Sequence, residues 1–156
     1  MLAVGDSTRL EIIFHTKRYK NKIIKQPRIE SNEGKPDKTV SIQAQIVIQP
    51  DSTYPIVISP YKLNISQFGE KIRNEMTFKI ENVSDQDLKP TIVDIPSDLF
   101  EVDMPDKINA GKTEEAVLKL KEFALEQNFE KTFTIELNDE AKTRFSIPVR
   151  RALRLP

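Results

Sequence analysis

The chain repeats its own pattern at a spacing of 106 residues, and the first copy is shorter than the second. The aligned pairs include Gly5 with Gly111, Ile12 with Leu118, Phe14 with Leu120, Ile23 with Phe129, Lys25 with Lys131 and Asn32 with Asn138. Both copies close with an alternating segment, at residues 40–47 and 144–149. Residues 50–110 add further strands before the second copy, whereas only residues 1–4 precede the first. We therefore expect the chain to start within one domain and to continue through a complete second one.

Apolar and polar residues alternate with a period of two along most of the chain, which is typical of strands with one buried face. Residues that favour turns separate these segments. The predicted strands are residues 10–14, 21–31, 39–48, 55–59, 62–66, 74–82, 88–95, 100–103, 113–121, 129–138 and 143–149. Residues 122–127 favour a single helical turn. This pattern predicts an all-β fold: a tandem antiparallel immunoglobulin-like β-sandwich whose first copy is incomplete.

The alternation breaks at residues 49–52, where we predict the domain boundary. Pro50 removes a backbone donor, and Asp51 and Ser52 favour local turns. We predict the C-terminal half of an Ig-like domain at residues 1–49, a linker at 50–54, a complete Ig-like sandwich at 55–150 and a tail at 151–156. The first unit would leave an apolar face and open edges, because a sandwich needs two sheets. We expect an upstream segment to complete it, the alternative being contact with the second domain.

Phenylalanines at alternating strand positions are the predicted core of the sandwich. They are Phe14, Phe78, Phe100, Phe123, Phe129, Phe133 and Phe145. Aliphatic side chains on the same faces would fill the space around these rings, each contributing roughly 1.5–3 kcal/mol of burial free energy.

A known family shares the strand pattern of the first copy. Gly5 begins a strand that continues through Phe14, and Lys25, the turn at Asn32 and a final alternating strand follow. This arrangement resembles the back half of the bacterial Ig-like family catalogued as domain of unknown function 1573, which has Hydin-type Ig-like relatives. The family's Cys-Gly-Cys segment has no match in this chain, and no functional residue is carried over. The resemblance implies an exported or cell-envelope protein of bacteria, periplasmic or envelope-associated, without known activity.

Basic residues cluster in a stretch that contains no acidic residue between positions 12 and 29. They are Lys17, Arg18, Lys20, Lys22, Lys25 and Arg28. Such a cluster can neutralise the phosphates of a nucleic acid or an anionic lipid, and it is the candidate anion contact of the chain. The alternative is a solvated hairpin whose lysines discourage pairing between sheet edges. We expect no nucleic acid partner, because no nucleic-acid motif or stacking platform accompanies the charge.

No residue pattern indicates catalysis, a metal or a cofactor. The chain has no cysteine, and His15 is its single histidine, so a thiolate nucleophile and a Cys/His zinc site are excluded. Six aspartates that could suggest calcium, at positions 85, 87, 94, 98, 103 and 106, lack the spacing of a dedicated loop. A sugar site is disfavoured by the absence of Trp.

The sequence therefore predicts a non-enzymatic, structural or protein-binding module without cofactor. Its partner is expected to be a protein, bound by strand addition at an exposed sheet edge. Two alternatives remain: an accessory C-terminal module of a larger envelope enzyme, and an anion-binding module that uses residues 17–28.

Overall fold

The chain forms two compact units in a computed structural model, at residues 1–48 and 49–156. The structure describes residues 7, 10, 12, 14, 19–30, 38–46 and 53–154. The predicted division into a partial and a complete domain stays a prediction.

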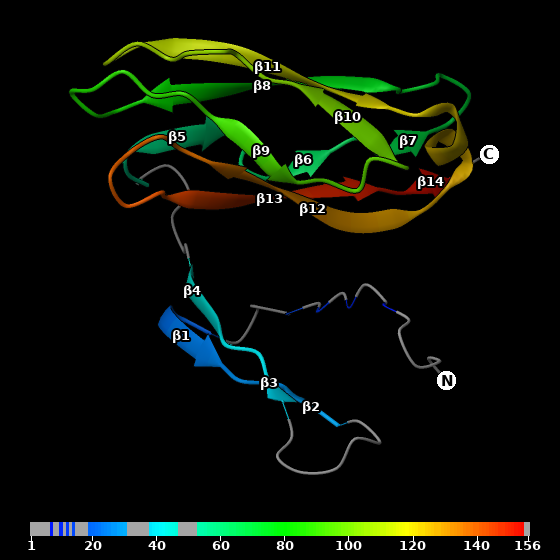
Figure 1. Cartoon of the computed structure of the whole chain (residues 1–156). Helices are drawn as coiled ribbons and strands as arrows, with labels where there is room; N and C mark the ends of the chain where they lie inside the picture. Colours follow the sequence, from blue (N-terminus) through cyan, green and yellow to red (C-terminus); the bar gives the residue numbers. More distant parts are fainter. Residues whose placement is uncertain are drawn as a thin grey trace. The chain divides into compact units, whose positions relative to one another are not determined.

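The second unit is a sandwich of two four-stranded sheets (Figure 1). Its elements are β5 (Ile56–Ser59), β6 (Leu63–Asn64), β7 (Gln67–Phe68), β8 (Glu75–Asn82), β9 (Thr91–Asp94), β10 (Phe100–Asp103), β11 (Thr113–Leu120), the 3₁₀ helix η2 (Glu122–Glu126), β12 (Phe129–Glu136), β13 (Arg144–Arg151) and β14 (Leu153–Arg154). One sheet has the order β10-β11-β8-β5, and the other has the order β6-β13-β12-β9. This architecture confirms the predicted all-β, antiparallel Ig-like sandwich.

The first strand of this unit changes sheets part-way along its length. β5 pairs antiparallel with β8, whereas β6 pairs parallel with β13, and Pro60 lies between β5 and β6. β7 then pairs parallel with β14. The sequence predicts a turn at Gln67 and Phe68 and a tail at residues 151–156. Instead, Arg151 ends β13, and β14 follows it, because the neighbouring parallel strand supplies backbone partners that a local pattern cannot reveal.

The core lies between the two sheets and contains most of the predicted phenylalanines. Phe78, Phe100 and Phe133 are at most 1% exposed, and the Phe133 ring centroid lies 6.2 Å from each of the other two. Aliphatic residues from both sheets fill the remaining space, as the alternation predicts. Phe123, in contrast, is 72% exposed, so its assignment to the core is wrong. It lies in η2, where the period of two does not apply.

A buried guanidinium holds one end of the sandwich together. Arg151 is 1% exposed and donates five hydrogen bonds, all of them to neutral oxygens. The acceptors are the backbone carbonyls of Leu125, Ile65 and Arg73 and the side-chain Oε1 of Gln67, at 2.6–3.3 Å. Burial lowers the pKa of Arg151, yet a guanidinium remains protonated in proteins. Arg151 thereby connects η2, the β6–β7 segment and the end of β13.

The first unit contributes a hairpin made of four short strands: β1 (Asn21–Lys25), β2 (Arg28–Ile29), β3 (Lys38–Thr39) and β4 (Ile42–Ile46). Lys25 pairs with Ile42 and Arg28 with Thr39, so β1–β4 and β2–β3 belong to one continuous antiparallel register. Gln26 and Pro27 interrupt the predicted strand 21–31 because Pro27 has no amide hydrogen to donate. The predicted strand 10–14 falls outside the described residues except for Leu10, Ile12 and Phe14.

We predict that Phe133→Ala lowers the free energy of unfolding of the second unit by about 3–5 kcal/mol, because it leaves a cavity between Phe78 and Phe100. The exposed Phe123→Ala is the control, with an expected change within about 0.5 kcal/mol. Urea denaturation followed by circular dichroism measures both. Equal effects of the two substitutions would contradict this description of the core.

We also predict that Arg151→Met lowers the free energy of unfolding by at least about 3 kcal/mol, because one buried and two partly buried carbonyl oxygens lose this donor. Arg150→Met, at the exposed neighbouring position, should change it by less than about 0.5 kcal/mol. Amide exchange in the Arg151→Met variant should accelerate first in residues 65–73 and 122–128. Unchanged exchange there would show that this guanidinium is not the connection.

Candidate functional site

The hairpin of the first unit has two chemically different faces. Its inner face carries half-buried, mainly apolar side chains, and its outer face carries exposed ones. The inner residues are Ile23, Lys25, Pro27, Ile29, Ile42, Ala44 and Ile46. The outer residues are Lys22, Ile24, Gln26, Arg28, Gln43 and Gln45. This separation follows from the strand period, which sends successive side chains to opposite sides.

Coverage of the inner face is incomplete. None of the described residues of the first unit is buried, whereas the second unit contains a core of 19 buried hydrophobic residues. Val40, which follows β3, is 39% exposed, and Ile12 is equally exposed. An apolar sheet face left open in this way is a feature of surfaces that bind another protein segment.

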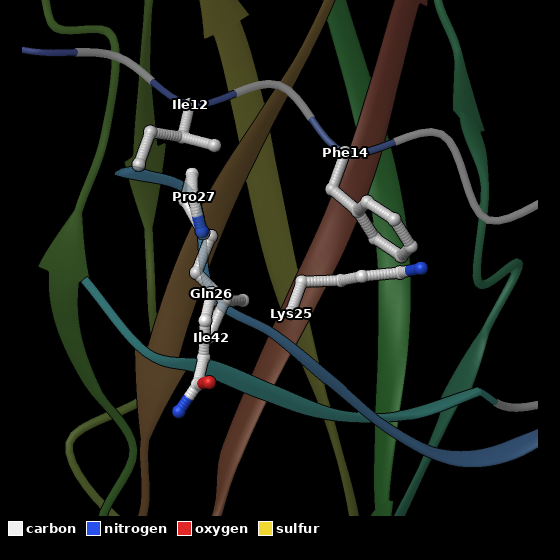
Figure 2. Close-up of a pocket in the computed structure, with 6 residues that line it drawn as sticks. All are labelled: Ile12, Phe14, Lys25, Gln26, Pro27 and Ile42. Atoms are coloured by element: carbon white, nitrogen blue, oxygen red, sulfur yellow. The ribbon is translucent and has the colours of Figure 1, made fainter. Parts of the chain in front are cut away.

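A cavity of about 300 Å³ lies above this inner face (Figure 2). Its lining is mainly apolar and consists of Ile12, Phe14, Lys25, Gln26, Pro27 and Ile42. In Figure 2, Ile12 and Phe14 extend from one segment toward the hairpin, which supplies the other residues. The volume is at the lower end of the range for ligand pockets, and it suffices for one or two apolar side chains.

Aromatic contacts fix one side of the cavity. The ring centroids of Phe14 and Tyr19 lie 5.2 Å apart, and the Nζ atom of Lys25 lies 4.6 Å from the Tyr19 centroid. A cation above an aromatic face is stabilised by the ring quadrupole. Lys25 therefore has a structural contact on the inner side of the hairpin.

The predicted anion-binding residues divide between the two faces of the hairpin. Lys22 and Arg28 lie on the outer face, and Arg28 forms an ion pair of 2.9 Å with Glu30. Lys25 lies on the inner face, and Lys20 is exposed just before β1. Lys17 and Arg18, together with His15, lie outside the described residues. Anion binding by this cluster stays a prediction.

The hairpin corresponds to the one that β12 and β13 form in the second unit. The repeat aligns Ile23 with Phe129. In the structure, Ile23 pairs with Ala44, whereas Phe129 pairs with Arg151. The hairpin in the second unit is therefore one residue longer, and Gln43 is the counterpart of Arg150. In the second unit, β13 has a further neighbour in β6, and β12 has one in β9. Among the residues described in the first unit, β1 and β4 pair only with each other.

Sequence reasoning identified the basic residues of this hairpin but missed the two glutamines of β4. Gln43 and Gln45 lie on a strand of sequence Ile-Gln-Ala-Gln-Ile that carries no charge. The absence of charge along a potential edge strand was the available signal, since edges that must stay unpaired usually carry charges.

The six aspartates considered for calcium lie in separate parts of the second unit, with Asp94 and Asp103 at the ends of β9 and β10. Within the described part of the chain, no group of three or more His, Cys, Asp or Glu residues could hold a metal ion. Asp87 is already engaged, because its Oδ2 lies 2.6 Å from the Nζ of Lys107 and its Oδ1 accepts the amide of Ala110 at 3.0 Å. The hydrogen bond from Lys107 lowers the pKa of Asp87 below its ordinary value of 3.8. The Asp87 carboxylate therefore connects its own loop to the segment that contains Lys107 and Ala110.

The tyrosines near the start of the second unit do not form a flat aromatic platform for a sugar. Tyr61 packs against the core, and its hydroxyl donates to the carbonyl oxygen of Ser146 at 2.8 Å. Burial raises the pKa of Tyr61. Tyr54 is 69% exposed. Over the described residues, the structure contains no helix with the length and apolar character needed to cross a membrane.

Solved structures are similar to this chain over about two thirds of its length. A protein of unknown function from Porphyromonas gingivalis W83 aligns with a TM-score of 0.50 and 18% identity, over 65% of this chain and 48% of that one. The MSP family member WR4 from C. elegans aligns with a TM-score of 0.44 and 16% identity, over 64% of this chain and 98% of that one. The YadV chaperone aligns with a TM-score of 0.44 and 16% identity, over 65% of this chain and 52% of that one.

At 18% identity, the similarity to the Porphyromonas gingivalis protein concerns the fold alone. This chain spans about half the length of the Porphyromonas gingivalis protein. No family model matches the chain, and the comparison with curated proteins gives no match. The resemblance to the bacterial family with domain of unknown function 1573 therefore stays a prediction.

We predict that Asp87 contributes stability that is present at neutral pH and lost in acid. The folded-state pKa of this carboxyl is lowered, so its contribution is present above the unfolded pKa of about 3.9 and disappears as the pH falls through the folded value. Asp87→Asn should therefore be less stable than the unmodified chain at pH 7, and the difference should shrink below about pH 4. Thermal unfolding between pH 2 and pH 7 measures it. Asp85→Asn, which removes an exposed carboxylate two residues away, is the control.

Proposed function

We propose that this chain is a non-catalytic Ig-like module of a bacterial cell envelope that binds a protein segment by strand addition at the hairpin of its first unit. The observation that carries the proposal is the open inner face of this hairpin, together with the outer edges of β1 and β4, which have no further strand partner among the described residues. Sheet edges bind extended segments through backbone hydrogen bonds, and pockets for alternate side chains provide specificity. The envelope location rests on the sequence resemblance.

The second unit is less suited to strand addition because three of its four edge strands, β5, β9 and β10, are protected. β5 is bounded by Pro55 and Pro60, and β9 pairs with β12 through an irregular register. β10 has four residues, two of which are the acidic Glu101 and Asp103. Short strands, prolines, irregularities and charges are the usual means by which sheets avoid edge pairing. These features favour a scaffold role for the second unit.

An accessory role in a larger envelope enzyme and anion binding by the basic stretch remain the alternatives. The separation of Lys22 and Arg28 from Lys25, on opposite faces of the hairpin, favours the protein-binding proposal over a single anion site. Absence of retention on heparin at low salt would be the expected result for the full chain.

The test is amide hydrogen exchange on the full chain with and without peptides that imitate neighbouring strands. Two synthetic peptides copy residues 61–68 and 90–96, which include β6 and β9, the neighbours of β13 and β12, and a third copies residues 74–82, which include β8 of the opposite sheet. At least one should slow exchange by about tenfold or more in residues 21–25 or 42–46, because added backbone hydrogen bonds protect an edge. Exchange in the core strands β8 and β12 should not change, which makes them the internal control.

Failure of all three peptides to alter exchange in the hairpin would contradict strand addition. Protection confined to the second unit would also contradict it, because the peptide would then have replaced a native strand rather than joined the open hairpin.

A further inference from the structure

The backbone groups that face away from the hairpin can be assigned to particular residues. The amide of Val40 donates to the carbonyl oxygen of Pro27 at 3.1 Å, so these two residues face each other across the hairpin. In an antiparallel ladder, alternate residues direct both backbone groups toward the partner strand, and the residues between them direct both groups outward. In this register, Lys22 and Ile24 point their backbone groups outward from β1, and Gln43 and Gln45 point theirs outward from β4.

The second unit shows how the corresponding edge of β13 is used. The amide of Ile65 donates to the carbonyl oxygen of Arg150 at 2.9 Å, and the amide of Gln67 donates to that of Ala152 at 2.9 Å. Arg150 and Ala152 are the counterparts of Gln43 and Gln45. The segment that makes these bonds runs parallel to β13 and places Leu63 and Ile65 in the core, each 0% exposed.

Charge distinguishes the two edges of the first hairpin. The edge of β1 carries Lys22, and Lys20 precedes it, whereas β4 contains only Ile, Gln and Ala. A strand that joined β1 would place its backbone beside these ammonium groups, and lysine is the residue that most often discourages edge pairing. The uncharged edge of β4 has no such obstacle.

The inner face next to β4 has room for apolar side chains. Leu63 pairs with Val149, whose counterpart is Ile42, and Ile42 lines the cavity of about 300 Å³. Ala44 lies two residues further along β4, and its counterpart in the second unit is the larger Arg151. A segment that joins β4 in this register would direct one apolar side chain toward the cavity and a second over the small Ala44.

From these observations, and on the basis of the proposed function, we propose that the outer edge of β4 accepts an extended segment of a partner protein in parallel orientation. The segment carries bulky apolar side chains at alternate positions, with an uncharged polar residue between them. The carbonyl oxygen of Gln43 accepts its central amide, as that of Arg150 accepts the amide of Ile65. β1 does not take part.

The probe is a fluorescent peptide that copies residues 61–68, and its binding to the full chain is measured by fluorescence anisotropy. Gln43→Pro removes an outward amide of β4, and Lys22→Pro removes an outward amide of β1, so the two variants are a matched pair. Gln43→Pro should weaken binding by about tenfold or more, since each 1.4 kcal/mol corresponds to a factor of ten. Lys22→Pro should leave the affinity within about twofold.

A second pair of variants retains every backbone amide, in case a proline disturbs the hairpin. Gln43→Lys places a charge on the edge of β4 and should weaken binding, whereas Lys22→Gln should not. A control peptide in which the residues copied from Leu63 and Asn64 exchange places has the same composition. This control peptide should bind at least about tenfold more weakly, because its two apolar side chains then lie on opposite faces of the added strand.

Loss of binding in Lys22→Pro with retention in Gln43→Pro would overturn the assignment to β4 and leave strand addition itself intact. Equal binding of the two peptides would overturn the alternating apolar pattern. Light scattering without peptide tests whether the chain dimerises. A dimer that Gln43→Pro abolishes would identify a second copy of the chain, rather than a partner segment, as the occupant. Absence of peptide binding in any form would contradict the proposed function as well.

Discussion

The requirement that the apolar face of a β-sheet be covered explains both units of this protein. In the second unit, two sheets cover each other, and Phe78, Phe100 and Phe133 meet between them. Burial of such faces is the main favourable term in folding, so the sandwich has a stable core. The first unit has a hairpin with the same pairing as β12 and β13, yet none of its described residues is buried. An unsatisfied face of this kind is the physical basis of the proposed docking.

Arg151 shows how a polar group can replace apolar packing at the end of a sandwich. Its guanidinium donates to the carbonyls of Leu125, Ile65 and Arg73, which belong to three different segments. Without Arg151, the buried carbonyl oxygen of Ile65 would lose this donor, at a cost of about 1–3 kcal/mol. In the first hairpin, the same position is Ala44, which makes no such connections with its side chain.

The strand period predicted much of the structure because it reflects a local property of the backbone. It located β8, β11 and β12 to within a few residues and predicted β10 without error. It failed at Phe123, since a 3₁₀ turn changes the direction of successive side chains. It also failed at β7 and β14, because their parallel pairing joins residues about 86 positions apart, which no local pattern encodes. The candidate site was predicted in part: the basic residues were found, and the edge formed by Gln43 and Gln45 was not.

The sequence by itself determined the fold class, the repeat and the alternation that gives the hairpin its two faces, because these depend on spacing along the chain. Tertiary structure alone decided which strands are neighbours and which side chains are covered. The burial of Arg151 and the exposure of Phe123 are examples, since both depend on segments distant in sequence. The same reason applies to the candidate site: the outward direction of the Gln43 backbone follows from its register with Ile24, and the register exists only in the folded hairpin.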